Sequence, residues 1–358
     1  MANLATHDVR LVETDPRARG YERGTQLKQR IATGFDLYLR LFHRYGLTER
    51  GVEESARSSL ASVASWDAQL LRELEGVAQG SGLDLWQIMA LNARTEILSA
   101  VPGGRPGECS TVARVSSRVF GAQTWDWHDE MSHLWHAQDV AGTPHAFAGL
   151  TESGILSKIG LNDAGISVFL NILGHRGDRV GGVPVHLLTW AVLANAGTLE
   201  EAVEIIEGAP VSASSALTVL TPDEGAVLEV SPAGVARIDP SAGWLAHCNH
   251  FLSSALAAEE KSELFEPDSQ QRLSLVQSRL HRYPAPRDSE DLLAYLYSDV
   301  DQPALCCVPA PDAVFGDRWR TLATVTSDNR AGRLAIYSGS PIEARGKEPV
   351  VLYPGAGA

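Results

Sequence analysis

The chain has 358 residues, with 30 lysines and arginines against 44 aspartates and glutamates, so its formal net charge is −14. This excess of negative charge argues against a protein that binds nucleic acid, whose binding surface is basic. It also argues against a protein that binds an anionic membrane surface. Hydrophobic residues make up 44% and charged residues 21%, which is typical of a globular protein rather than a disordered one.

The first ten residues lack the basic and apolar segments of a secretory signal. No segment approaches the ~18 consecutive apolar residues of a membrane-spanning helix. The four cysteines, Cys109, Cys248, Cys306 and Cys307, are too few and too irregularly spaced for a disulfide framework, and no CxxC spacing suggests zinc. We therefore expect a cytoplasmic protein with reduced thiols, without a nucleic-acid or membrane partner.

The first hundred residues have helical patterns. Apolar residues recur at helical spacing over residues 16–45, 60–77 and 85–98. Asp84, directly before the third pattern, is the expected N-cap of that helix. Residues 101–108 follow, and five of these eight are glycine or proline, which predicts a loop.

From residue 110 onward most predicted elements are strands. A helical pair interrupts them at residues 184–195 and 199–207, the second opened by a capping-box pattern of Thr198 with Glu201. Strands grouped around a helical pair favour a layered α+β fold over an alternating parallel sheet. We predict strands at 110–115, 119–127, 216–220, 225–230, 235–238 and 244–249, hairpins at 156–173 and 321–338, and helices at 269–281 and 288–297.

Cys109 lies directly after the glycine- and proline-rich loop and directly before a predicted strand. A free cysteine is usually a buried packing residue, but this one stands where the helical patterns give way to strands. A cut immediately before Cys109 would leave a helical piece and a strand-rich piece that begins with a nucleophile. The new α-amine, with a pKa near ~8, would then be able to accept the proton of its own thiol.

Six short motifs occur in the same order as similar motifs of one enzyme family. The chain resembles the acyl-coenzyme A:isopenicillin N acyltransferase family, a cysteine branch of the N-terminal-nucleophile hydrolases, over nearly its whole length. The motifs are GYERG at residues 20–24 followed by Gln26, LNARTE at 91–96, CST at 109–111, QTWDW at 123–127, IGLNDAGISV at 159–168, and Asn249 with His250.

This resemblance implies a four-layer αββα sandwich, in which two stacked, mainly antiparallel sheets lie between helical layers. Residues 1–108 would be a helical pro-segment and residues 109–358 the strand-rich catalytic part of one domain. Cys109 would be the nucleophile, exposed by self-cleavage of the Glu108–Cys109 bond. Asp126 would orient the new α-amine through a charge-assisted hydrogen bond, and the side-chain amide of Asn249 would donate to the developing oxyanion.

Two further roles are less sharply defined by the resemblance. Arg318 stands where the family has an arginine near the nucleophile, but Arg320 is two residues away and strand alternation would put both on one face. Asn171 resembles an asparagine of the oxyanion hole in the related choloylglycine hydrolases, and a packing or turn role is the alternative.

The chain also departs from the family pattern. Glu108 stands where the family often has glycine, which tolerates the strained backbone of an N-to-S acyl shift. Glutamate would either hinder that strain or serve as a local base. Asp317 stands where the penicillin enzyme has serine, which changes the charge near the predicted site and argues against the same substrate.

Two other functional classes compete with this interpretation. A metal-dependent hydrolase is suggested by four histidines within eighteen residues, but no HExxH or zinc-like spacing is present, so surface or packing roles are favoured. A scaffold that keeps the fold without cleaving is suggested by Glu108. Trp125, Trp127 and Trp135 would line an acyl pocket or belong to the core. The histidines are His128, His133, His136 and His145, and they lie near Asp126, Asp129 and Glu130.

The sequence therefore predicts a self-processing cysteine amidohydrolase or acyltransferase. It would act on a small N-acyl amide or an acyl thioester through a thioester acyl-enzyme, with hydrolysis favoured over penicillin synthesis. No cofactor is expected, and acyl-coenzyme A is the alternative acyl donor. The two cleavage fragments are expected to remain associated.

Overall fold

The strands form two sheets that stack face to face. The computed structural model describes residues 8–101, 108–261, 268–299 and 301–355. An eight-stranded sheet has the order β1-β4-β5-β6-β7-β8-β9-β10, and a six-stranded sheet has the order β11-β2-β3-β12-β13-β14. Neighbouring strands are antiparallel except for the parallel pair β1 and β4. The sequence prediction of two stacked, mainly antiparallel sheets is confirmed.

The central strands of the two sheets are buried along most of their length because the sheets cover each other and helices cover their outer faces, whereas β10 and β14 at the sheet edges are partly exposed. The eight-stranded sheet consists of β1 (Asp8–Leu11), β4 (Trp135–Val140), β5 (Phe147–Glu152), β6 (Ile159–Asn162), β7 (Ser167–Ile172), β8 (Ser215–Leu220), β9 (Gly225–Ser231) and β10 (Gly234–Ile238). The six-stranded sheet consists of β11 (Trp244–His247), β2 (Glu108–Val115), β3 (Val119–His128), β12 (Trp319–Asp328), β13 (Arg333–Ser338) and β14 (Val350–Leu352).

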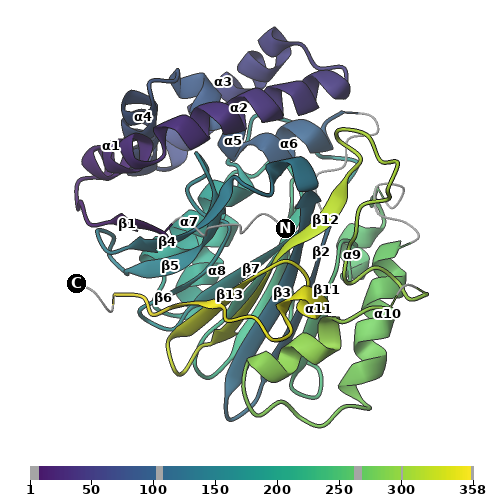
Figure 1. Cartoon of the computed structure of the whole chain (residues 1–358). Helices are drawn as coiled ribbons and strands as arrows, with labels where there is room; N and C mark the ends of the chain where they lie inside the picture. The colour runs from purple at the N-terminus through teal and green to yellow at the C-terminus, as the bar shows by residue number, and fades with distance from the viewer. Residues whose placement is uncertain (1–7, 102–107, 262–267, 300, 356–358) are drawn as a thin grey trace.

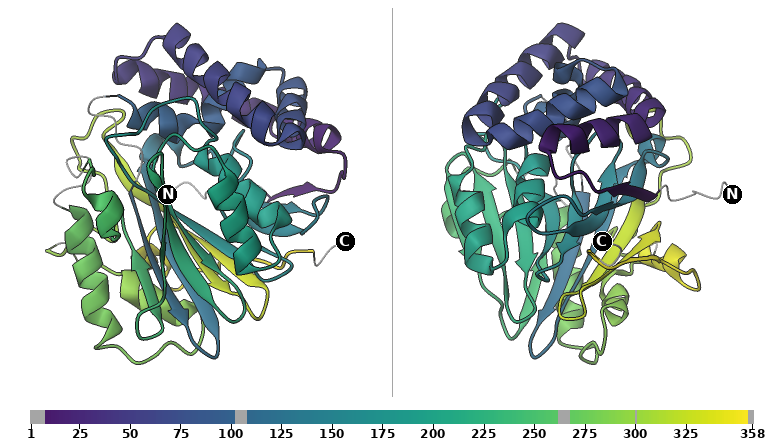
Figure 2. Two further views of the ribbon diagram at one scale, coloured as in Figure 1. Left: turned by 180° about the vertical axis from the view of Figure 1, so that it is seen from behind. Right: turned by 90° about the vertical axis from the view of Figure 1, so that its left-hand side faces the viewer.

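Helices cover the outer faces of both sheets, which completes the αββα order (Figures 1 and 2). The helices α7 (Val185–Asn195) and α8 (Leu199–Gly208) pack on the eight-stranded sheet. The helix α10 (Asp268–Leu280) and the 3₁₀ helix η3 (Glu290–Leu296) pack on the six-stranded sheet. The predicted capping box that opens α8 is present. Two short helices complete this part, α9 (Ser254–Ala257) and α11 (Pro341–Ala344).

The N-terminal helices lie across one end of the two sheets (Figure 1). Each of the three predicted helical patterns is divided in two, and the division after residue 66 is made by Asp67, whose side chain accepts hydrogen bonds from the N–H groups of Gln69 and Leu70. These helices are α1 (Pro16–Gln26), α2 (Lys28–Arg44), α3 (Glu49–Trp66), α4 (Ala68–Ser81), α5 (Leu85–Asn92) and α6 (Arg94–Ser99).

The first motif of the sequence, at residues 20–24, lies where two helices cross, and glycines on both helices permit that crossing. The helices α1 and α4 cross so closely that a Cβ added to Gly20 would lie 2.0 Å from the carbonyl oxygen of Glu73. A Cβ added to Gly76 would lie 2.1 Å from the carbonyl oxygen of Arg17. Only glycine permits this approach of two backbones, so the motif at residues 20–24 builds the helical layer rather than the site.

The sequence did not predict four of the strands. One of them, β1, pairs in parallel with β4, with Leu11 opposite Val140. Within residues 8–101 the regular elements are therefore helices and one strand that belongs to the eight-stranded sheet. The other three are β4, β5 and β14. Among the helices of the described residues, none combines the length and the apolar character that crossing a bilayer requires.

Candidate active site

Cys109 is the second residue of β2 and lies at the interface of the two sheets. Its side chain is 5% exposed and contributes to the wall of a small cavity. In the β2–β3 pair Cys109 lies opposite Trp125. All three tryptophans belong to the buried core, as the second sequence interpretation predicted, and Trp125 and Trp127 also line the cavity, so their contact with an acyl group stays a prediction.

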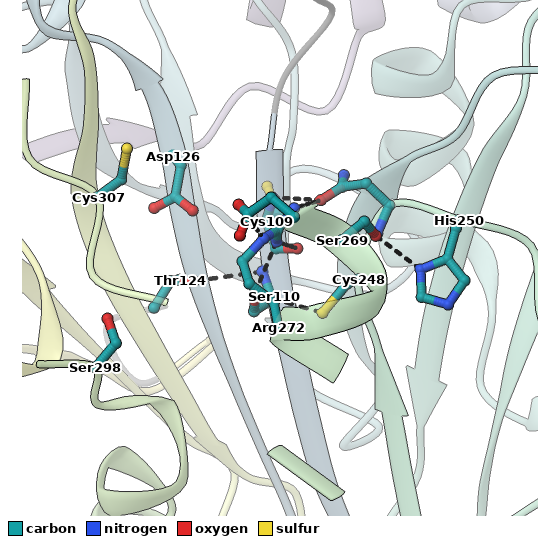
Figure 3. A network of polar contacts seen from close by, with 12 residues as sticks. Cys109, Ser110, Thr124, Asp126, Cys248, His250, Ser269, Arg272, Ser298 and Cys307 are labelled. Atoms are coloured by element: carbon teal, nitrogen blue, oxygen red, sulfur yellow. Dashed lines mark hydrogen bonds and ion pairs between the residues drawn. The ribbon is translucent and has the colours of Figure 1, made fainter. Parts of the chain in front are cut away.

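The main chain of Cys109 is held on both sides by side chains from other elements. Its N–H donates to Oδ1 of Asn249 at 3.0 Å. Its carbonyl oxygen accepts from Nδ2 of Asn171 at 3.0 Å and from Nη1 of Arg272 at 3.1 Å. Figure 3 shows Arg272 directly beside Cys109 and Ser110. Three distant segments therefore converge on one residue, which fixes its position at the end of the strand.

Asn249 follows β11, and its own N–H donates to Oγ of Ser269. Its Oδ1 accepts from the Cys109 N–H and, at 3.0 Å, from Nη2 of Arg272. Both neighbours of this atom are donors, so the orientation of the amide is determined by its partners. The Nδ2 atom lies 2.9 Å from the carbonyl oxygen of Ile172, a residue that lines the Cys109 cavity. This Nδ2 donates its hydrogen bond to that carbonyl, and Asn249 is not among the described residues that line the cavity, so its oxyanion role stays a prediction.

Asn171 reaches Cys109 from β7 of the opposite sheet. Its Nδ2 donates to the carbonyl oxygens of Cys109 and, at 3.4 Å, of His247. Its Oδ1 accepts from Oγ1 of Thr111 at 2.7 Å. Because its amide hydrogens point at main-chain carbonyls, Asn171 holds the strand that carries Cys109 in place. The oxyanion role stays a prediction for this residue.

Gln123 was part of a motif in the sequence but received no role there. It is fully buried between the sheets, where its Nε2 donates to Oγ1 of Thr111 at 2.6 Å and to the carbonyl oxygen of Leu170 at 2.9 Å. The N–H of Leu170 in turn donates to its Oε1. Gln123 therefore connects β3 with β7 next to β2, the strand that carries Cys109.

Arg272 was missed by the sequence analysis. It lies on α10 and is completely buried, with its Nε bound to Oδ2 of Asp268 at 2.9 Å and its Nη1 bound to Oγ of Ser110 at 3.0 Å. The sequence held one signal for it. Residues 269, 272, 273 and 276 follow helical spacing and form the buried face of α10, and an arginine within such a stripe must have a buried partner.

Asp126 is buried on β3 and lines the cavity. Its Oδ1 accepts a hydrogen bond of 2.5 Å from Oγ1 of Thr321. The register of β12 shifts between Thr321 and Ala323, opposite Trp125 and Asp126. Such a bulge redirects a side chain beside a functional site, and here it delivers the threonine hydroxyl to the carboxylate.

The thiol of Cys109 is a weak acid in the unbroken chain. Burial raises its pKa to about 12, and the negative charge of Asp126 acts in the same direction. The positive charges of Lys158 and Arg272 and the main-chain N–H of Asp126 oppose this rise. The thiol is therefore protonated at neutral pH until a base removes its proton.

A buried cluster of charges forms another wall of the cavity. One oxygen of Glu152 accepts from Nη2 of Arg94 at 2.6 Å and from Nζ of Lys158 at 2.9 Å, and the other oxygen accepts from the hydroxyl of Tyr38. Burial opposes the charge of Glu152, but Arg94 and Lys158 outweigh it and hold the pKa of this carboxyl well below its usual range. Burial lowers the pKa of Lys158 to about 8.

The structure places the two predicted arginines away from Cys109. Arg318 binds Asp129 at 3.0 Å, and Arg320 lies 3.6 Å from the same carboxylate, so both are on one face as strand alternation predicted. Both side chains are about 40% exposed, and neither lines the cavity. Asp317, the departure from the family pattern, forms an ion pair with Arg44 at the surface. It therefore leaves the charge of the cavity unchanged.

The histidines of the metal hypothesis have separate environments. His128 is buried, with its ring centroid 4.7 Å from that of Trp127 and 4.5 Å from that of Trp319, and burial lowers its pKa to about 3. His145 binds Asp163 at 2.8 Å in a partly exposed position. Within the described part of the chain, no group of three or more histidine, cysteine, aspartate or glutamate side chains is arranged to hold a metal ion.

The chain thus stacks two sheets between helical layers, with Cys109 near the start of a strand at their interface. Residues 114–343, well over half of the chain, match the family model described as acyl-coenzyme A:6-aminopenicillanic acid acyl-transferase. The chain belongs to this family. A curated relative, the 40 kDa form of acyl-coenzyme A:6-aminopenicillanic-acid-acyltransferase from Emericella nidulans, is 27% identical over 335 residues, which is 91% of each chain.

Three solved structures are partly similar. The N-acylethanolamine-hydrolyzing acid amidase ortholog of Caenorhabditis elegans is 15% identical, with a TM-score of 0.44 over 62% of this chain and 93% of its own. The C2A mutant of the conjugated bile acid hydrolase of Clostridium perfringens is 12% identical, with a TM-score of 0.46 over 68% and 92%. The penicillin V acylase of Agrobacterium tumefaciens is 14% identical, with a TM-score of 0.44 over 68% and 84%.

Proposed function

We propose that this chain cleaves itself between Glu108 and Cys109, and that the mature protein hydrolyses or transfers the acyl group of a small N-acyl amide through a thioester on Cys109. One observation supports this most strongly. Both main-chain polar groups of Cys109 are bound by side chains from other elements, and its thiol adjoins a cavity. A cysteine that only fills space would need neither arrangement.

Self-cleavage would begin with attack of the Cys109 sulfur on the carbonyl carbon of Glu108. The S–C bond forms, the C–N bond breaks, and water then hydrolyses the resulting thioester. Asn249 binds the nitrogen that would leave, since its Oδ1 accepts from the Cys109 N–H in the unbroken chain. This contact supports a role in directing the main chain at the cleaved bond.

In the mature protein the new α-amine of Cys109 would act as the base for its own thiol. Asp126 lies opposite Glu108 in the β2–β3 pair and lines the cavity, so its carboxylate is near enough to orient that amine. After attack on a substrate amide, the side-chain amide of Asn249 would donate to the oxyanion. The α-amine would pass its proton to the leaving amine, and the thioester would be released to water or to a second amine.

The substrate class follows from the cavity and from the family. Trp125, Trp127, Ile159 and Leu170 give the cavity apolar walls, which suit the acyl part of a small amide. The name of the Emericella relative includes both an acyl thioester and an amine, which supports a covalent acyl-enzyme with either outcome. We favour hydrolysis, and acyl-coenzyme A remains the alternative donor.

Intact mass measurement after incubation with a panel of N-acyl amides tests this function. We expect an acyl mass added to the larger fragment, located on Cys109 by peptide mapping and removed by hydroxylamine. A Cys248→Ala variant is the matched control, since removal of this second buried cysteine should leave the adduct unchanged. An unbroken chain without turnover would instead indicate a scaffold, and turnover that stops with a chelator but survives thiol alkylation would indicate a metal-dependent hydrolase.

A further inference from the structure

Lys158 lies directly before β6 and is 3% exposed. Lysine is almost never buried without a specific partner, and no sequence motif marks this residue. Its ammonium group lies in the wall of the same cavity as the Cys109 thiol. The described structure thus places a second group that can exchange protons beside the nucleophile.

The position of the Lys158 amine relative to the thiol follows from the strand register. Nζ lies 4.4 Å from the centre of the Trp125 ring. Trp125 is directly opposite Cys109, and paired residues of an antiparallel ladder project from the same face with their Cβ atoms about 4.5–5.5 Å apart. The amine and the thiol are therefore on one face of the six-stranded sheet, and each charge shifts the pKa of the other group.

Of the two buried cations, Lys158 and Arg94, the surrounding charges make Lys158 the one that can lose a proton. Glu152 is shared between Arg94 and Lys158, so the cluster carries one positive charge in excess. Burial and the charge of Arg94 lower the pKa of Lys158, whereas Glu152 opposes that change. Arginine does not lose its proton in proteins. The groups that face Lys158 are Tyr38 of α2, Arg94 of α6, Cys109 of β2, Asp126 of β3, Glu152 of β5 and His186 of α7.

The unbroken chain needs a base that the mature protein does not need. Before cleavage the Cys109 nitrogen is an amide and has no basic lone pair, so the proposed α-amine base does not yet exist. Asp126 accepts the hydroxyl of Thr321 and raises the pKa of the thiol, which hinders ionisation. Lys158 in its neutral form has a free lone pair, and after taking a proton its positive charge stabilises the thiolate.

We propose that Lys158 is the proton carrier of self-cleavage: its neutral amine takes the thiol proton of Cys109 and returns it to the Cys109 nitrogen. The sulfur bonds to the carbonyl carbon of Glu108, the C–N bond breaks, and the proton on Nζ moves to the departing nitrogen. The lysine ends in the state in which it began. The inference rests on the proposed self-cleavage and goes beyond it by naming a catalytic group for that step alone.

The chain is translated in a cell-free reaction, and its cleavage is then followed over time at pH 6 to 9 on denaturing gels to test this role. Lys158→Met should slow cleavage by about 10²-fold or more, the usual contribution of a general base. It should still fold, because Arg94 remains to balance Glu152. Lys158→Arg keeps the charge and should also cleave slowly. Lys261→Met is the matched control, since this lysine binds the carbonyl of Ser99 and does not line the cavity.

Two further measurements separate proton transfer from a structural role. The wild-type cleavage rate should rise with pH and level off, whereas Lys158→Arg should show no plateau up to pH 9. Turnover per cleaved molecule should fall less than tenfold in Lys158→Met, because the α-amine then serves as the base. If the wild-type chain cleaves and the Lys158→Arg chain cleaves with the same rate and pH profile, the role of Lys158 is overturned and the proposed function is not. A wild-type chain that never cleaves would overturn the proposed function as well.

Discussion

The parts of the chain before and after Cys109 contribute different things to the site. The part after it supplies the hydrogen-bond network that fixes the main chain of Cys109, through Asn171, Asn249 and Arg272. The part before it supplies Arg94, which lines the cavity and binds Glu152, and Tyr38, which binds the other oxygen of Glu152. The strands and α10 therefore hold the main chain of Cys109 and carry the charges that act on its thiol, whereas the helical layer acts at one remove, through the partners of Glu152.

Residues 8–101 are therefore an integral part of the fold and contribute side chains to the cavity wall, so they are not expected to separate after cleavage. Arg23 binds Gln138 at 2.6 Å, Arg94 binds Glu152 at 2.6 Å, and β1 pairs with β4. The side chain of Asn92 binds both the carbonyl of Gly154 and the N–H of Leu156. Cutting the chain at residue 108 breaks none of these contacts, so we expect the two fragments to stay together.

The largest expected effect comes from Cys109→Ala. This variant should abolish both self-cleavage and turnover, because no other described residue lies at the end of β2 with its main chain held in this way. Denaturing gels and a substrate assay measure both. Cys248→Ala should cleave and turn over normally. A Cys109→Ala chain that still splits into two fragments would show that the network around Cys109 has another purpose.

Asn249→Ala should lower kcat by about 10²–10³-fold, equivalent to about 2.7–4 kcal/mol, if its amide donates to the oxyanion. Steady-state kinetics of whatever fraction matures provides the number. Asn195→Ala is the matched control, since that exposed amide binds only the carbonyl of Ala191 within its own helix. A kcat within twofold of wild type would assign the oxyanion to other donors.

Several features of the site were accessible from the sequence because they lie in short contiguous motifs. Cys109 follows a glycine- and proline-rich loop, and the structure brings Asp126, Asn171 and Asn249 to it as the resemblance predicted, although their roles stay predictions. The loop at residues 102–107 lies outside the described residues. The hairpin of β6 and β7 and the capped helix α8 were also predicted correctly, because turn and capping residues act locally.

Other features depend on contacts that no local pattern encodes. The strand β5 is buried on both faces and has no alternation of apolar and polar residues, whereas β4 alternates only from Trp135 to Gln138, too short a run to mark a strand by itself. Arg272 and Lys158 lie next to Cys109 only because α10 and the start of β6 pack there. Arg318 matched a motif position, but its side chain turns to Asp129, which sequence spacing could not reveal.

Arg94→Met tests the helical side of the comparison. Breaking a buried ion pair typically costs about 3–5 kcal/mol of folding free energy, and we expect the lower end because Lys158 still neutralises Glu152. Chemical denaturation monitored by tryptophan fluorescence measures this change. Arg57→Met removes an exposed pair with Glu53 and should change the free energy of unfolding by less than about 1 kcal/mol. Equal effects of both variants would refute the buried cluster.

Glu96 gives the helical layer a pH-dependent stability. Burial raises its pKa to about 7 from 4.5, although the N–H of Val185 opposes the change. Because the folded pKa lies above the unfolded one, its contribution to stability is complete below about pH 4.5 and is lost as the pH rises through 7. Glu96→Gln should therefore be more stable than wild type by about 3 kcal/mol at pH 8 and by less than about 1 kcal/mol at pH 5. Denaturant titrations at both pH values check this, and a variant less stable at pH 8 would show that the carboxylate has a charged partner.

The smallest effect is expected from Arg318→Gln. Its ion pairs with Asp129 and Glu130 are partly exposed, and such pairs contribute about 0–1 kcal/mol. Cleavage and turnover should stay within about threefold of wild type, with Arg320→Gln as the companion variant. A loss of 10²-fold or more in the cleavage rate or in turnover would support the role near Cys109 that the family resemblance predicted for Arg318.

The most direct test asks whether activity appears only as the chain is cleaved before Cys109, and it follows the cleaved fraction and the turnover in one sample over time. Newly made chain is withdrawn at intervals, the larger fragment is sequenced from its first residue, and hydrolysis of an N-acyl amide is assayed in parallel. We expect the sequence Cys-Ser-Thr and an activity that rises in proportion to the cleaved fraction. Full activity in chain that is still unbroken would contradict the account.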